Sequence, residues 1–284
     1  MAANGRSRAQ QLRRFARRNP TIVAGGTILG LIALLAIAAP LFAGDAITMQ
    51  PALRLRPPSE TNWFGTDHLG RDVFARTIYG AQVSLFVGIS VAAVSISIGL
   101  LIGLLSGYFR KVDAVVMRLM DGLMAIPAIL LAIALVALTR ASVSTVIMAI
   151  TIPEIPRVVR LVRAVVLSVR EAPYVEAAVA GGTPTWKILL RHILPNTVAP
   201  LIVQATYICA SAILNEAGLS FLGAGTPPEI PTWGNMIASG RSFLQIAPWI
   251  IFFPGVCLAI TVLGINLLGD GLRDKLDPRV AKRL

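Results

Sequence analysis

Long apolar runs with few or no charges alternate with polar segments along this chain. The runs cover residues 21–43, 77–109, 122–139, 141–153 with a continuation to 169, 197–215 and 242–269. About 20 consecutive apolar residues cross the hydrocarbon core of a bilayer as a helix. The pattern therefore predicts an all-α, polytopic membrane protein with six transmembrane helices.

The distribution of basic residues predicts how these helices are oriented. Of the 26 Lys and Arg residues, 20 fall on the side that holds both ends of the chain and six on the other side. Cytoplasmic loops are enriched in Lys and Arg, so we expect both termini in the cytoplasm. The net charge of +12 then reflects topology, and we expect no nucleic-acid partner. We expect the basic N-terminal tail to contact anionic membrane lipid.

With this orientation the chain divides into five parts. They are a cytoplasmic basic tail (1–20), a first transmembrane helix (21–43), an outer loop with an interfacial helix (44–81), a core of five transmembrane helices that includes an inner loop at 171–195 (82–269), and a cytoplasmic tail (270–284). Ala36-Ile37-Ala38 resembles a signal-peptide cleavage site. The first run has 23 uncharged residues, more than the about 7–15 of a signal core, so we favour an uncleaved helix.

Composition argues against several classes of function. Hydrophobic residues make up 55% of the chain and charged residues 14%, against about 45–50% and about 25% in soluble domains, so a soluble enzyme is not expected. Cys209 and Cys257 lie inside apolar runs, which indicates neither a disulfide framework nor a cysteine metal site. The sequence holds no Gly-x-x-x-x-Gly-Lys-Ser/Thr loop, so we do not expect this chain to bind ATP in the usual way.

The inner loop reads as two short helices with a break between them. Pro173 fits a first helical turn, and the pair Gly181-Gly182 can stop that helix with positive φ. We expect Thr183 to cap a second helix that has Pro184 at its first position and ends at Pro195. The alanines on the first helix allow another backbone to approach closely, so the loop is a candidate docking knob; the alternative is an ordinary interfacial hairpin.

The inner loop resembles the EAA loop of ATP-binding-cassette (ABC) importer permeases. The resemblance rests on Glu176-Ala177-Ala178, Gly182 and the closing Leu194-Pro195; His192 departs from the usual aliphatic residue. It implies a type I ABC importer permease fold in which this loop is a coupling helix seated in a cleft of the cytoplasmic ATPase. By resemblance, that role falls to Glu176, Ala177, Ala178 and Gly182.

An outer segment, residues 64–72, combines turn glycines with charged residues. Gly65 and Gly70 suit turns, Asp72 can cap a helix, and the residues that follow form an apolar stripe typical of an interfacial helix. Asp67, His68 and Asp72 could be metal ligands, but no second histidine lies nearby, so we expect no metal site.

Two outer segments resemble signatures of the C-type membrane subunits of dipeptide, oligopeptide and nickel importers, most closely those of dipeptide importers. These segments are 64–72 and 215–223 with Pro231-Thr232-Trp233-Gly234 after it. The resemblance implies a heterodimer with a homologous B-type permease, two cytoplasmic ATPase domains and an extracytoplasmic peptide-binding protein. ATP and Mg²⁺ would then be bound by the ATPase partners, and this chain would need no cofactor.

Ionisable residues at membrane depth are costly and are therefore functional candidates. Glu154, between Pro153 and Pro156, either faces a translocation path or pairs with Arg157 three residues on. Asn215 and Glu216 lie at the outer mouth, where they either contact substrate or occupy a water-exposed helix end.

Two sets of regularly spaced residues have an architectural interpretation. Arg157, Arg160 and Arg163 recur every third residue, which favours interfacial anchors. Glycines recur every fourth residue at 99, 103 and 107 and predict close helix packing.

The sequence and the resemblance together predict a non-enzymatic permease subunit of an ABC importer in a bacterial cytoplasmic membrane. It would move dipeptides or short oligopeptides inward by ATP-driven alternating access. Nickel, haem or glutathione import by the same family stays open as an alternative. A more remote alternative is an intramembrane enzyme, but no histidine lies in any predicted span and the acidic residues there are far apart in sequence. A channel without an ATPase would leave the EAA-like loop unexplained.

Overall fold

Helices dominate the fold. The structure is a computed structural model that describes residues 15–276, so most of the predicted tail 1–20 and part of the tail 270–284 lie outside the described residues. No β-strand forms in residues 15–276, which confirms the all-α class. The helices are α2 (Pro20–Phe42), α3 (Val73–Tyr108), α4 (Arg110–Ala125), α5 (Ala128–Ala137), α6 (Val143–Arg170), α7 (Pro173–Ala180), α8 (Thr185–Ile188), α9 (Leu194–Phe221), α10 (Trp233–Gly240) and α11 (Trp249–Leu276), with short turns at Pro51–Leu53, Leu189–Ile193 and Arg241–Phe243.

Four helical segments are long and apolar enough to cross a membrane. They are α2, α3, the stretch Thr185–Phe221 and α11, and the bent pair α4–α5 raises the number to five. Helix α6 has 28 residues but carries Glu154 and several arginines along its length. These helix lengths are compatible with six transmembrane helices, and that count stays a prediction.

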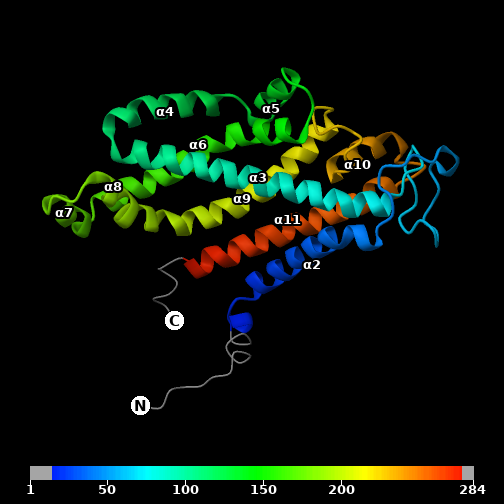
Figure 1. The fold of residues 1–284 in the computed structure, drawn as a ribbon, viewed down its shortest axis with the longest axis horizontal. Helices are drawn as coiled ribbons and strands as arrows, with labels where there is room; N and C mark the ends of the chain where they lie inside the picture. The colour runs from blue at the N-terminus through cyan, green and yellow to red at the C-terminus, as the bar shows by residue number, and fades with distance from the viewer. Residues whose placement is uncertain (1–14, 277–284) are drawn as a thin grey trace, which may run out of the picture.

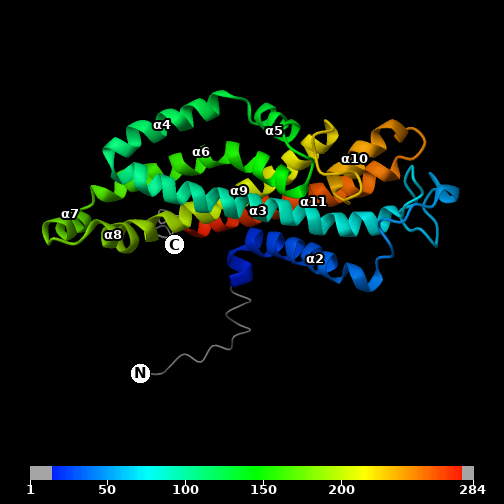
Figure 2. The same ribbon diagram turned by 45° about the horizontal axis from the view of Figure 1, so that its top comes forward.

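The long helices lie along the long axis of the molecule (Figure 1). Helices α7 and α8 form one end, and the segment between α2 and α3 lies at the opposite end with α10 close to it. Helix α2 lies along α11, as a second view also shows (Figure 2). The two ends therefore hold the inner and outer loops that the sequence singled out.

Helices α3 and α6 pack closely through the predicted glycine face. An ideal Cβ atom on each of the three glycines would lie only 2.5–2.7 Å from the Cβ atom of a valine on α6. The pairs are Gly99 with Val158, Gly103 with Val162, and Gly107 with Val166. Both helices advance by four residues between contacts, so they run parallel. This contact confirms the glycine prediction and forms much of the hydrophobic core.

Two predicted elements have different boundaries in the structure. The interfacial helix expected before the second span is the beginning of α3, because Asp72 caps that helix at Val73 and no break follows before Tyr108. Residues 122–139 do not form one straight helix, because α4 and α5 meet at an angle of 86°. Pro127 disfavours helical geometry at the preceding residue, and Ile126 is accordingly extended with φ −91° and ψ 127°.

The glycine face of α3 can be tested by substitution. Gly103→Val would place methyl groups inside Val162, and overpacking of this kind costs about 1–3 kcal/mol of unfolding free energy. Gly122→Val on α4 is the control, since an added Cβ there meets nothing within 4 Å. We expect the full-length chain to unfold at lower SDS concentration for Gly103→Val only. Equal losses in both variants would contradict the packing role.

Candidate functional site

The inner loop forms a compact helical hairpin. Pro173 begins α7, as predicted, and Gly182 has a φ of +73°. The N–H of Gly182 donates to the carbonyl of Val179 and that of Thr183 to the carbonyl of Ala178, both at 3.0 Å. This Schellman pair closes α7 as the two glycines predicted. Helix α8 begins two residues after Thr183 and shows no side-chain cap bond, so the predicted Thr183 cap is wrong.

The second helix of the hairpin does not end at Pro195. Helix α8 passes through a π turn at Leu189–Ile193 directly into α9, whose first turn holds Pro195. The N–H of Leu194 donates to the carbonyl of Leu189, five residues back. Proline is tolerated in a first helical turn because no donor is needed there. The hairpin is therefore continuous with a membrane span from Thr185 to Phe221.

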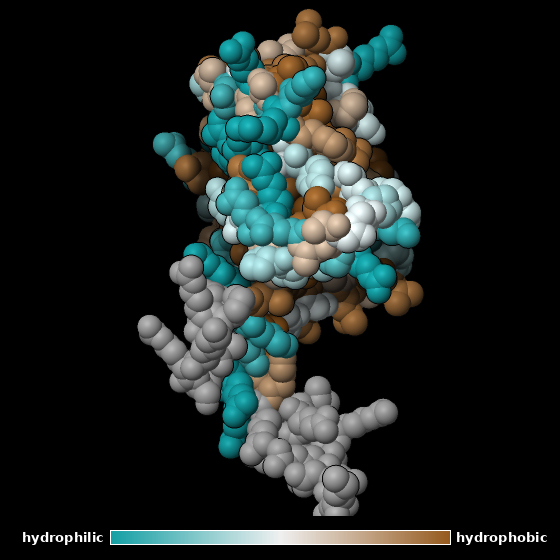
Figure 3. Space-filling model, turned by 90° about the vertical axis from the view of Figure 1, so that its left-hand side faces the viewer, coloured by the Kyte–Doolittle hydropathy of each residue, from teal (hydrophilic) through white to brown (hydrophobic). Residues whose placement is uncertain are grey.

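The predicted coupling residues lie together on the exposed part of this hairpin. Glu176, Ala177 and Gly182 are exposed and Ala178 is half-buried. Buried side chains hold the hairpin from behind; they are Val175, Ile188 and Ile193. Figure 3 looks onto this end of the molecule, where hydrophilic side chains alternate with hydrophobic ones. The exposed hydrophobic side chains here include Tyr174, Val179 and Trp186. A mixed surface of this kind suits docking to a soluble protein.

The arginines of α6 form ion pairs. Arg157 Nη1 lies 3.0 Å and 3.2 Å from the carboxylate oxygens of Glu154, whose side chain is only 2% exposed. The pairing that the sequence left open is therefore present. Arg160 and Arg163 pair with acidic residues of α4, namely Asp121 and Asp113. Arg160 and Arg163 thus join α6 to α4, and the interpretation of the three arginines as interfacial anchors stays a prediction.

At the outer end, residues 64–72 form a tight turn around a buried carboxylate. Asp67 accepts hydrogen bonds from the N–H groups of Leu69 (2.8 Å) and Arg71 (2.9 Å) and from Arg71 Nε (2.7 Å). Gly65 and Gly70 have φ values of +73° and +76°. An added Cβ at Gly70 would overlap the carbonyl of Gln50. The carboxylate of Asp67 is thus engaged by the protein itself.

Glu216 joins α9 to the outer loop. Its side chain is fully buried, and Oε1 accepts hydrogen bonds from the hydroxyls of Ser220 (2.9 Å), Thr226 (3.4 Å) and Thr232 (2.9 Å). Asn215 is half-buried and lines, with Pro153, a small hollow between α5, α6 and α9. The structure therefore places Asn215 in the same hollow as Pro153, the residue before Glu154. The Glu216 carboxylate is instead bonded to hydroxyls of the outer loop.

Sequence reasoning did not single out Arg76 as a site residue of this outer end, and it included Trp233 only as part of a signature segment. The buried guanidinium of Arg76 donates to the carbonyls of Ala46 (3.0 Å) and Pro228 (3.3 Å). Trp233 Nε1 donates to the carbonyl of Thr77 at 3.0 Å. Arg76 directly precedes the apolar run 77–109, and a charge in that position was the available signal for a buried contact. In the sequence analysis it contributes only to the predicted orientation of the helices in the membrane.

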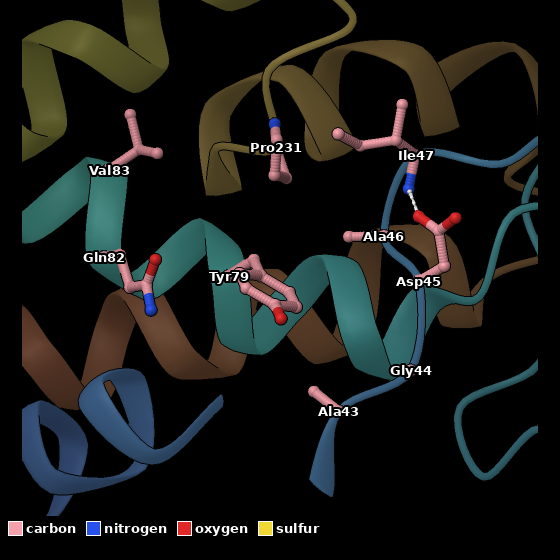
Figure 4. A pocket seen from close by; sticks show the side chains of 9 residues that line it. All are labelled: Ala43, Gly44, Asp45, Ala46, Ile47, Tyr79, Gln82, Val83 and Pro231. Atoms are coloured by element: carbon pink, nitrogen blue, oxygen red, sulfur yellow. Dashed lines mark hydrogen bonds between the residues drawn. The ribbon is translucent and has the colours of Figure 1, made fainter. Parts of the chain in front are cut away.

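A groove of about 610 Å³ opens between the end of α2, the first turns of α3 and Pro231 (Figure 4). Its lining is mainly apolar, and Asp45 is the carboxylate in it. Hydrogen bonds from the Thr48 hydroxyl and from the N–H groups of Ile47 and Thr48 lower the pKa of Asp45. Gln82 Nε2 donates at 2.5 Å to the carbonyl of Ala36, which Pro40 leaves without its helical donor. Among the described residues, no base lines the groove beside the carboxylate, unlike in an acid–base catalytic pair.

Comparison with known families identifies similar chains. Residues 95–282 match the model described as binding-protein-dependent transport system inner membrane component. Residues 7–58 match the model described as N-terminal TM domain of oligopeptide transport permease C.

Three curated relatives align with nearly the whole chain. A probable peptide ABC transporter permease protein of Sinorhizobium fredii is 59% identical, covering 95% of this chain and 93% of that protein. A dipeptide transport system permease protein of Alkalihalophilus pseudofirmus is 43% identical, covering 93% and 88%. A glutathione transport system permease protein of Pectobacterium atrosepticum is 42% identical, covering 94% and 90%.

A solved structure shares the fold. A chain of the MetNI methionine ABC transporter in an inward-facing conformation superposes with a TM-score of 0.56 and 20% sequence identity. The match covers 71% of this chain and 96% of that chain. At this identity the likeness shows a common fold alone.

His68 gives the outer turn a dependence on pH. Its ring stacks on that of Phe243, and burial lowers its pKa, helped by nearby arginines and opposed by Asp67. Because the unfolded chain then binds the proton more readily, stability falls as pH drops below the ordinary histidine pKa of about 6.5. We expect His68→Phe, which keeps the stacked ring, to lose less thermal stability than the wild type when pH falls from about 7.5 to about 5.5. Identical losses would show that folding leaves the pKa of His68 unchanged.

Proposed function

The chain belongs to the family of binding-protein-dependent transport system inner membrane components, and we propose that it is the C-type permease subunit of an ABC importer for dipeptides or short oligopeptides. The names of the peptide and dipeptide relatives support this cargo. One structural observation carries the mechanism: the exposed α7–α8 hairpin is continuous with a membrane span.

The hairpin couples ATP hydrolysis to movement of α9 in this proposal. Glu176, Ala177, Ala178 and Gly182 face a cleft in the cytoplasmic ATPase, where the small side chains permit close approach. Displacement of the ATPase then pulls on α8, and the π turn passes this displacement to α9 because no loop intervenes. ATP and Mg²⁺ stay on the ATPase partners, and this chain uses no cofactor of its own.

The proposed assembly contains three kinds of partner, of which the family description supports the binding protein. A homologous B-type permease completes the membrane domain, two ATPase domains bind the inner hairpins, and an extracytoplasmic peptide-binding protein delivers cargo to the outer end. Both termini lie in the cytoplasm of the bacterial cell, as the 20 basic residues on that side support. Alternating access then opens a path between the two permeases.

Glu154 and Asn215 are the proposed contacts along that path. Pro153 and Asn215 line one hollow between α5, α6 and α9, and Glu154 follows Pro153 directly. Glu216 has three hydroxyl partners and no exposure, which supports a role in holding the outer loop. Its contact with substrate at the outer mouth stays a prediction.

Gly182→Asp tests the coupling role. An aspartate there finds open space within this chain but projects into the proposed ATPase cleft. We expect loss of ATPase co-purification and at least a ten-fold fall in ATP-dependent dipeptide uptake into vesicles, equal to about 1.4 kcal/mol of coupling.

Gly223→Asp is the matched control. Gly223 also closes its helix with a Schellman pair, has a φ of +81° and has open space around it, but it follows α9 at the outer end. We expect the Gly223→Asp variant to keep the ATPase bound, because the substitution lies at the outer end. Full uptake and normal ATPase binding by Gly182→Asp would overturn the coupling role.

The cargo is tested in the same vesicles with the co-encoded binding protein and ATPases. Labelled di- and tripeptides are compared with glutathione, nickel and haem. Preferred uptake of glutathione, nickel or haem would keep the permease assignment and replace the peptide cargo. Uptake that continues without the ATPases would refute an ABC importer.

Glu154→Gln separates a path contact from a structural ion pair. A path contact predicts a changed KM for peptide, whereas a purely structural pair predicts lower thermal stability with KM unchanged. Arg157→Gln is the companion variant, because it breaks the same pair and leaves the buried carboxylate without its cation. We expect KM to change in Glu154→Gln alone. Unchanged KM and substrate range in both variants would remove Glu154 from the path.

A further inference from the structure

A hollow of about 580 Å³ opens between α6, α9 and α11 on the side of the α7–α8 hairpin. This volume lies within the about 300–1,000 Å³ of small-molecule sites. Its lining includes Asn196, Ala199, Pro200 and Val203 of α9 together with Arg273 of α11. None of the coupling or path residues proposed above lines it.

The hollow extends from the membrane boundary towards the hydrocarbon core. Arg273 lies in the last turn of α11, beyond the end of the apolar run at 269, and Asn196 lies in the first turn of α9. Val203 is seven residues further along α9, about 10 Å deeper at 1.5 Å per residue. Asn196 and Arg273 are the polar lining residues at the boundary end, where Leu276 also lies; apolar residues of α9 follow, and Gln204 lies at the deep end.

In the part of the chain that the structure describes, Arg273 is the one charged residue that lines the hollow. Arg273 is exposed and has no ion pair or hydrogen bond with another residue of the described range 15–276. Asp270 and Asp274 neighbour it in the sequence, but neither lines the hollow. Among residues 15–276, no carboxylate that could bind the ammonium group of a peptide lines the hollow. This chemistry favours an anionic, amphiphilic ligand over peptide cargo.

We propose that this hollow binds one anionic phospholipid of the cytoplasmic leaflet, with its phosphate at Arg273 and an acyl chain along Ala199, Pro200 and Val203. Basic pockets between transmembrane helices on the cytoplasmic side are a recurring site for anionic headgroups. This lipid site rests on the proposed function in one respect only: the leaflet is called cytoplasmic because both termini are proposed to lie in the cytoplasm. The lipid bridges α9 and α11 directly beside the hairpin and so stabilises the inner end of the bundle.

Removal of the cation tests the headgroup contact. The full-length chain, purified with its partner subunits, is titrated with phosphatidylglycerol or phosphatidylcholine in detergent, and bound lipid is measured by native mass spectrometry. We expect Arg273→Gln to weaken phosphatidylglycerol binding about five-fold, as expected for one basic residue near a membrane surface. Lys275→Gln is the matched control, because Lys275 is exposed in the same turn and lies over the ring of Phe15 instead. Equal effects of both variants would show general surface electrostatics and overturn the site.

Filling the hollow tests the acyl-chain contact. The larger side chain in Val203→Trp fills part of the hollow that Val203 lines. Ile202→Trp is the control, because Ile202 is an exposed neighbour on α9 that does not line the hollow. We expect Val203→Trp alone to lose bound phosphatidylglycerol while its melting temperature without added lipid matches that of Ile202→Trp. Lipid retained by Val203→Trp contradicts the proposal.

Peptide transport provides an independent outcome. If Arg273→Gln changes the KM for peptide and leaves lipid binding intact, the hollow is a peptide passage and the lipid proposal fails. Lipid binding is measured without transport, so failure of the proposed cargo leaves this test unaffected.

Discussion

A bilayer core offers no water to hydrogen-bond with buried polar groups, so the polar groups of this bundle must find partners within the protein. The carboxylate of Glu154 pairs with Arg157, and the carbonyl that Pro40 leaves free accepts a hydrogen bond from Gln82. At the outer end the Glu216 carboxylate accepts hydrogen bonds from three hydroxyls, and the Arg76 guanidinium donates to two loop carbonyls. Breaking one such group from its partner is costly because water cannot replace it.

These polar contacts divide the molecule into two regions of different construction. The outer end is bound by hydrogen bonds that converge from α3, α9 and the loop before α10, which favours a fixed shape. The inner end is held by a close α3–α6 seam and a hairpin that projects beyond it. The coupling proposed above requires this combination, since in that proposal motion enters at one end and is resisted at the other.

Local sequence signals predicted local structure well. Asp72 caps α3, Pro173 begins α7, Gly182 adopts positive φ, and the glycines of α3 meet α6, because each of these depends on residue type and short spacing. The ion pairs of α4 with α6 join residues 39 and 50 positions apart, which no spacing rule reaches. The bend between α4 and α5 had a signal in Pro127, but the apolar run across it dominated the prediction. The predicted helix end at Pro195 is wrong because residue type alone does not distinguish a helix end from a first helical turn.

The π turn between α8 and α9 holds one residue more than the α-helix it interrupts, because its closing hydrogen bond spans five residues instead of four. Deleting a single residue within 189–193 would therefore restore a continuous α-helix and leave α8 and α9 in nearly the same rotation about the helix axis. Deleting a residue from the regular part of α9 would instead rotate the hairpin by about 100° relative to the rest of that helix. The short stretch at 189–193 can thus lose a residue without redirecting the hairpin, and the regular turns of α9 cannot.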